Sequence, residues 1–98
     1  MPDTGFLIIR AVVSSEEREQ FDHWYETDHL KSAMQTMGAE AAWRFWSETD
    51  LNVHYAMYQF SDILKPKTIK SQADSGGGAT LRWPNVKITR EVWRQASQ

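Results

Sequence analysis

The chain has 98 residues, a formal net charge of −2, no cysteine and no basic run. This length predicts one domain, residues 1–98, and the charge argues against a nucleic-acid partner, which would require a basic patch. Disulfides and thiolate chemistry are excluded. Because no apolar run reaches the roughly 18 residues of a membrane span, and residues 1–3 do not open a signal peptide, we expect a cytoplasmic protein with no membrane partner.

The first predicted element is a strand at residues 6–13, a β-rich and nearly continuous apolar run. Such a run is typical of a strand buried on both faces. Arg10 interrupts one of these faces, and an unpaired charge there would be strongly destabilising. We therefore expect Arg10 to pair with a carboxylate or to bind an anionic ligand, and we favour the ion pair.

A long helix should follow, capped by Ser14 or Ser15. Its apolar residues change side after Asp28, since the later ones fall nearly opposite the earlier ones at 100° per residue. One straight helix cannot bury both sets, so we expect a bend or break at residues 28–31. Gly38 is the expected C-cap. The later apolar residues are Leu30, Ala33, Met34 and Met37.

The second half of the chain predicts two strands, a helix and a last strand. Residues 41–47 and 52–60 should form an antiparallel hairpin. A helix should then end at the glycine-rich segment 75–78, and residues 86–93 should form the last strand. The order β-α-β-β-α-β is that of an α+β, ferredoxin-like fold with an antiparallel sheet.

Both faces of this sheet should be apolar, although the helices can cover only one of them. A second copy of the sheet is the simplest cover for the other face. We therefore predict a homodimer in which two sheets pack face to face as a dimeric α+β barrel.

The densest cluster of polar and aromatic residues is the segment 21–30. Tyr25 and His29 are four residues apart, so they lie on the same side of a helix. A phenol beside an imidazole can move a proton to or from a substrate near neutral pH, and Asp28 or Glu26 could orient the ring. The alternative is that His29 lies at a helix end, where its positive charge interacts favourably with the helix dipole. The residues alone leave both open.

Further candidates could bind a small-molecule ligand. Five tryptophans are many for 98 residues, and Trp24 and Trp46 could line a pocket or pack the core. Arg44 shares a strand face with Trp46 and could pair with an acid or bind an anion. His54 is a further ligand candidate, but we expect a sheet histidine with satisfied hydrogen bonds.

Other chemistry has little support in the sequence. Residues 76–78 are three glycines without the Gly-Lys-Ser/Thr of a phosphate loop, so a mobile lid or a linker is favoured. No metal-ligand spacing and no catalytic triad can be assembled. We therefore predict no metal and no cofactor.

Residues 21–30 resemble the Phe-x-x-Trp-Tyr-x-x-Glu-His-Ile/Leu-Pro signature of small dimeric α+β barrel proteins, the group around the EthD-like family. Trp24, Tyr25 and His29 match, Asp28 replaces the glutamate, and Lys31 stands where relatives often have proline. The resemblance implies a homodimer with a pocket between each sheet and its helices, which the helix histidine faces. Activities in this superfamily include cofactor-free oxygenation, isomerisation, dehalogenation and decarboxylation.

These observations predict a cofactor-independent enzyme acting on a small, aromatic or cyclic organic molecule. His29 would be its general acid or base, with Tyr25 as its hydrogen-bonding partner. Two alternatives remain: a non-catalytic protein that binds a small molecule in the same pocket, and a haem-handling monooxygenase of the same fold.

Overall fold

The computed structural model describes residues 3–75 and 83–97. The predicted order of elements is confirmed. Two strands and one helix follow the first strand and the long helical region, and a last strand closes the sheet. These elements are β1 (Gly5–Val12), β2 (Ala41–Trp46), β3 (Val53–Phe60), α3 (Leu64–Asp74) and β4 (Lys87–Arg94). The three glycines at 76–78, for which we expected a lid or a linker, lie outside the described residues.

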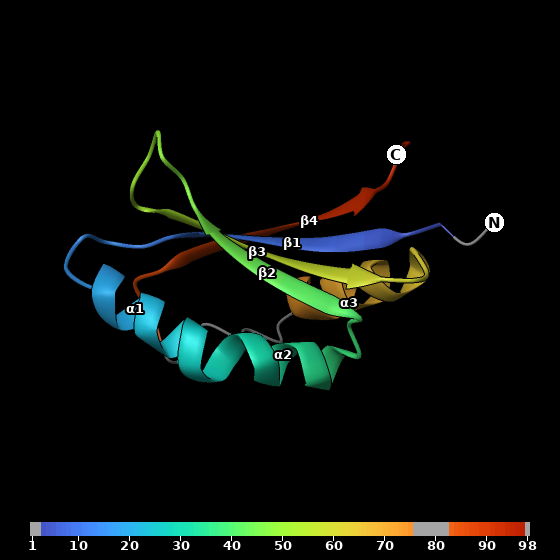
Figure 1. The fold of residues 1–98 in the computed structure, drawn as a ribbon, viewed down its shortest axis with the longest axis horizontal. Helices are drawn as coiled ribbons and strands as arrows, with labels where there is room; N and C mark the ends of the chain where they lie inside the picture. Colours follow the sequence, from blue (N-terminus) through green and yellow to red (C-terminus); the bar gives the residue numbers. More distant parts are fainter. Residues whose placement is uncertain (1–2, 76–82, 98) are drawn as a thin grey trace.

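The four strands form one antiparallel sheet in the order β2-β3-β1-β4. β1 is central and pairs with β3 on one side and β4 on the other. All the helices lie on one face of this sheet (Figure 1). Side chains of odd-numbered β1 residues and even-numbered β2, β3 and β4 residues therefore share the helix side, since directly paired residues point the same way.

The long helical region consists of α1 (Arg18–Trp24), a π-helical segment η1 (Tyr25–His29) and α2 (Leu30–Met37). The expected irregularity at 28–31 is a π-helical turn rather than a break: the turn begins earlier, at Tyr25, overlaps the expected segment at residues 28 and 29, and the helix continues through it. In that turn the N–H of Leu30 donates to the carbonyl of Tyr25, five residues back. The wider turn changes the phase of the residues that follow, so the apolar side can shift without a break. Gly38 ends the helix at φ 73°, as predicted.

The core lies between the helices and the sheet. It is built from residues such as Leu7, Phe21, Tyr25 and Tyr58, none of them more than 4% exposed. The other face of the sheet is left uncovered by the described residues (Figure 1). Three aromatic side chains on strands remain 42–49% exposed there, namely Trp43, Phe45 and Trp93. Among the described residues, no helix is long and apolar enough to cross a bilayer.

Candidate functional site

A small cavity lies between the long helix and the sheet. Its walls are mostly apolar and aromatic. Apart from the indole N–H groups of the tryptophans, the polar and charged side chains that the described residues contribute are Tyr25, His29, His54 and Arg90. It offers about 30 Å³ to the centres of water molecules, which is room for about two waters. An organic ligand therefore needs more room than the cavity offers in this structure. The cavity occurs where the resemblance placed a pocket.

His29 reaches this cavity because of the π-helical segment. Its ring stacks on Trp24, with ring centroids 4.3 Å apart and an interplanar angle of 16°. In a regular α-helix two residues five apart would point about 140° away from each other, whereas a π turn brings them together. Burial lowers the pKa of His29 below its ordinary 6.5. The ring is therefore neutral at pH 7 and able to accept a proton.

Tyr25 touches His29 through its ring rather than through a hydrogen bond. The two rings meet edge to face, with centroids 4.8 Å apart. The Tyr25 hydroxyl lies instead 3.2 Å from the Tyr58 hydroxyl, and either of the two can donate. Burial raises the pKa of both phenols, so both keep their protons at neutral pH. The expected hydrogen bond from Tyr25 to His29 is thus replaced by a buried tyrosine pair.

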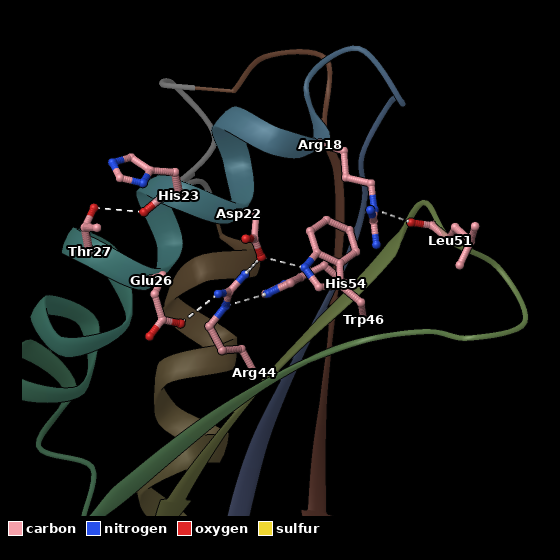
Figure 2. Close-up of polar contacts among 9 residues, drawn as sticks. All are labelled: Arg18, Asp22, His23, Glu26, Thr27, Arg44, Trp46, Leu51 and His54. Carbon is pink, nitrogen blue, oxygen red and sulfur yellow. Dashed lines mark hydrogen bonds and ion pairs between the residues drawn. The ribbon is translucent and has the colours of Figure 1, made fainter.

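Beside the cavity lies a hydrogen-bonded cluster that we call the Arg44 network: Asp22, Glu26, Arg44, Trp46 and His54 (Figure 2). Arg44 donates from Nη1 to Glu26 Oε1 at 2.8 Å and from Nη2 to Asp22 Oδ1 at 2.5 Å. Its Nε donates to His54 Nε2 at 3.2 Å. Trp46 Nε1 donates to the same Asp22 oxygen at 2.7 Å. Of the two alternatives that the sequence left open for Arg44, an acidic partner or a bound anion, the structure shows the acidic partner.

His54 is the most deeply buried polar residue of this network, with 1% of its surface exposed. Burial, and then the charge of Arg44, lower the pKa of His54 to about 3. The ring is therefore neutral throughout the physiological range. We expected a histidine with satisfied hydrogen bonds. That holds for Nε2, but Nδ1 is buried and has no hydrogen-bond partner within residues 3–75 and 83–97.

Four of the predicted site residues line the cavity: Trp24, Tyr25, His29 and His54. Arg44 and Trp46 do not line it. The Arg44 network connects them to His54 instead, so they hold a cavity residue in place rather than contact the cavity themselves. The expectation that these two side chains bind the ligand directly is therefore not supported by the geometry.

Two predicted residues lie elsewhere. Asp28 is exposed and makes no hydrogen bond to His29 in the part of the chain that the structure describes, so it does not orient the ring. Arg10 lies opposite Tyr55 and Thr89 on the uncovered face of the sheet, away from the cavity. The ion pair that we favoured for Arg10 is absent among the described residues. The position of Arg10 inside an apolar strand suggested a role for its charge, but it did not identify a residue or ligand that pairs with it.

Arg90 is a charged residue of the cavity that the sequence analysis missed. It is half-buried on β4, where it lies between Ile88 and Val92 on the helix side of the sheet. The signal was the one noticed for Arg10, a charge at an inward position between apolar residues. It was overlooked because β4 carries several other charged residues, which are exposed.

No protein-family model matches the chain, and no curated protein is found as a relative. Solved structures are similar. A dimeric ferredoxin-like protein from an uncultured marine organism has a TM-score of 0.66 and 11% identity, covering 100% of this chain and 99% of that one. The chain has a ferredoxin-like fold. These comparisons do not test the resemblance to the EthD-like family, which stays a prediction.

Two further structures with this fold carry functional descriptions. A Bacteroides thetaiotaomicron protein of unknown function, a possible oxidoreductase, has a TM-score of 0.66 and 14% identity, with 97% of this chain and 100% of that one covered. A candidate monooxygenase from Shewanella loihica has a TM-score of 0.53 and 13% identity, with 100% and 99% covered. At such low identity these similarities establish the fold alone.

Proposed function

We propose that this chain is a cofactor-independent enzyme that transfers a proton to or from a small organic molecule, with His29 as the general base or acid. One observation supports this most. His29 lies at the wall of an apolar cavity, and burial lowers its pKa below 6.5. A base that is neutral at pH 7 and shielded from bulk water is suited to this chemistry. The match of Trp24, Tyr25 and His29 to the EthD-like signature supports the same role.

The neighbours of His29 are consistent with a reversible proton transfer. The neutral ring would take a proton from a C–H or O–H bond of the ligand, whose electron pair stays on the ligand. The imidazolium formed would lie against the π face of Trp24, which attracts a cation. His54 is unsuited to this role, because a histidine with a pKa of about 3 does not hold a proton at neutral pH.

Cofactor-free oxygenation is the second candidate. Two proteins of the same fold are described as a possible oxidoreductase and a candidate monooxygenase. Deprotonation by His29 would again come first, and molecular oxygen would then be the oxidant. Oxygen consumption in an electrode cell separates this reaction from simple isomerisation. For the haem-handling alternative, the cavity as it stands is far too small for a porphyrin, and added haem should produce no shifted Soret band.

Hydrogen–deuterium exchange on small carbon acids tests the catalytic proposal. We would incubate the protein with cyclic and aromatic ketones and lactones in D₂O and follow the loss of C–H signals by NMR. His29→Ala should slow exchange by about 100-fold or more, while ligand affinity changes only a few-fold. His23→Ala is the matched control, since His23 is exposed on the same helix. Unchanged exchange in His29→Ala would refute the role, and binding without exchange in the wild type would favour a binding protein.

The proposed enzyme is a homodimer in which the uncovered faces of two sheets pack together. The exposed Trp43, Phe45 and Trp93 on that face support this, as does the description of two similar structures as dimeric ferredoxin-like proteins. A stable interface should bury at least about 1,500 Å² in total. Sedimentation should give a dimer at micromolar concentration and a monomer for Trp43→Glu. Leu64→Glu, on an exposed helix position, should stay dimeric.

A further inference from the structure

We infer that the cavity binds molecules with an acidic oxygen, a carboxylate or an enolate, which lies between the Nδ1–H of His54 and the guanidinium of Arg90. The inference rests on the proposed small-molecule site and names its substrate class. It joins two residues to which the proton-transfer proposal gives no task. One offers a buried hydrogen-bond donor, and the other offers a positive charge.

The Arg44 network determines which nitrogen of His54 carries the proton. A guanidinium can only donate hydrogen bonds. The His54 Nε2 atom, 3.2 Å from Arg44 Nε, must therefore be the acceptor. A neutral imidazole has one N–H, so the proton sits on Nδ1. The strongly lowered pKa of His54 agrees with a ring that stays neutral. The network thus presents a fixed Nδ1–H donor rather than a titrating group.

This donor is left without an acceptor by the described residues. His54 Nδ1 is buried and has no hydrogen-bond partner there, and the His54 ring lines the cavity. Folded proteins rarely leave a buried donor unsatisfied. An oxygen atom of a bound ligand would satisfy it. A ligand without an acceptor would leave the donor buried and unpaired, so the site discriminates in favour of oxygen-bearing molecules.

Arg90 adds the charge. It lines the same cavity, yet within residues 3–75 and 83–97 it has no ion pair or hydrogen bond. Its charge acts on the cavity, because it lowers the pKa of the neighbouring Tyr25 against the larger effect of burial. No aspartate or glutamate of residues 3–75 and 83–97 lines the cavity. Arg44, by contrast, is neutralised by two carboxylates. An anionic oxygen would thus meet Arg90 and the His54 donor together, an arrangement of strong charge-assisted hydrogen bonds.

The same pair would support the proposed proton transfer. When His29 takes a proton from the carbon next to a carbonyl, the C–H electron pair forms the C=C bond of an enolate. The carbonyl oxygen then carries the negative charge, and no oxidant is needed. A donor and a cation already in place at that oxygen stabilise the charge as it develops. His54 and Arg90 would then contact the reacting oxygen, while His29 moves the proton.

Matched acids and amides test the charge preference. The probes are benzoate with benzamide, and acetate with acetamide. The second pair is smaller and so closer in size to the cavity as it stands in the structure. Tryptophan fluorescence at pH 7.5 would report binding to the full chain. Each acid should bind about tenfold more tightly than its amide, as expected for a charge-assisted hydrogen bond. Arg90→Gln should reduce that preference to about twofold or less. Arg94→Gln makes the same change at an exposed position of β4 and should leave it intact.

The outcomes separate this inference from the function on which it rests. Equal binding of acid and amide to the wild type, or an unchanged preference in Arg90→Gln, would overturn the inference and leave the small-molecule site standing. Binding of neither probe pair would overturn both. Nitrogen-15 NMR of the imidazoles adds a measurement that needs no mutation. His54 should appear as the Nδ1–H tautomer, and its Nδ1 signal should move when benzoate binds. An Nε2–H tautomer would refute the proposal.

Discussion

The two histidines of the cavity occupy opposite kinds of environment. His54 comes from β3, is 1% exposed, and accepts a hydrogen bond from an arginine that two carboxylates hold in place. His29 comes from the π-helical segment, is half-buried, and is held by ring contacts with Trp24 and Tyr25. Both pKa values are lowered, but that of His54 falls to about 3 and takes the ring out of acid–base chemistry.

The difference shows how a small fold can give one residue type two tasks. A central strand with partners on both sides offers a rigid place for a donor whose protonation must not change. A helix with a local π turn offers a place where a ring can contact the cavity and still exchange protons, and such turns are frequent at functional sites. The experiments below remove or exploit one side of this comparison, beginning with the largest expected effect.

Removing Arg44 should have the largest effect on stability. Its side chain is 13% exposed. Arg44→Met leaves Glu26 and the Nε2 atom of His54 without their donor, and it leaves Asp22 with the Trp46 indole as its remaining donor. We expect a loss of about 2–3 kcal/mol in the free energy of unfolding, below the full value for a buried pair because the carboxylates reach water. Urea unfolding at one fixed protein concentration measures it.

Glu26→Gln is the control for this experiment. The Glu26 side chain is 67% exposed, and an exposed ion pair contributes at most about 1 kcal/mol. Its variant should therefore unfold near the wild type. If Arg44→Met were no less stable than Glu26→Gln, the Arg44 network would not be what holds His54, and the contrast between the two histidines would lose its structural basis.

The pH dependence of stability should be the next largest effect. The pKa of His54 is near 6.5 in the unfolded chain and about 3 in the folded protein. Between these values the unfolded chain binds a proton that the folded chain does not, so stability falls as the pH drops from 6.5 towards 3. The slope contributed by His54 can approach about 1.4 kcal/mol per pH unit. Asp22, whose pKa is lowered from 3.8, adds a further loss only below that pH.

Two variants sharpen this measurement. His54→Gln should flatten the slope between pH 6 and 4, because the glutamine does not titrate. His29→Gln should remove much less of it, since the pKa of His29 is less strongly lowered. Thermal or urea unfolding at several pH values gives both slopes. Equal slopes for the two variants would mean that the two rings are protonated alike, contrary to their environments.

The NMR titration of His29 is the next test, and its expected shift is smaller than that of His54. In the folded protein its NMR signals should titrate with a pKa below 6.5, since burial disfavours the charged ring. The His54 signals should stay constant over the same pH range. The rate of catalysed hydrogen–deuterium exchange should also be constant at pH values above the pKa of His29. A solvent-like midpoint for His29, unchanged by ligand, would place it outside the cavity and remove it as the base.

Most of the fold follows from local patterns in the sequence. The apolar run of β1 predicted a strand buried on both faces, and alternation in β2 predicted that Arg44 and Trp46 share one strand face, which in the structure is the helix side of the sheet. The shift of apolar side along the helix showed that a regular helix was impossible. It did not show that a π turn, rather than a break, would absorb the shift, because that depends on packing against the sheet.

The site was predicted only in part, for a physical reason. Spacing along one helix identified Tyr25 and His29, since these contacts are local. The hydrogen bonds that decide the state of His54 come from residues 10 to 32 positions away in the chain, on β2 and α1. Which of several inward charges finds a carboxylate is set by tertiary contacts. That is why the ion pair favoured for Arg10 forms at Arg44 instead, and why Arg90 was missed.

Substitution of Asp28 should have the smallest effect of all, and it tests whether this residue belongs to the site. The sequence offered it as a carboxylate that could orient His29, but it is exposed and makes no hydrogen bond to that ring in the described part of the chain. Asp28→Asn should therefore leave the NMR titration of His29, the rate of catalysed exchange and the stability unchanged, the last within about 0.5 kcal/mol. Asp22→Asn provides the comparison, because Asp22 accepts from both Arg44 and Trp46. That change should lower stability and disturb His54. If Asp28→Asn instead slowed exchange tenfold, this carboxylate would approach His29 during turnover, and the ring would be oriented by a side chain as well as by stacking.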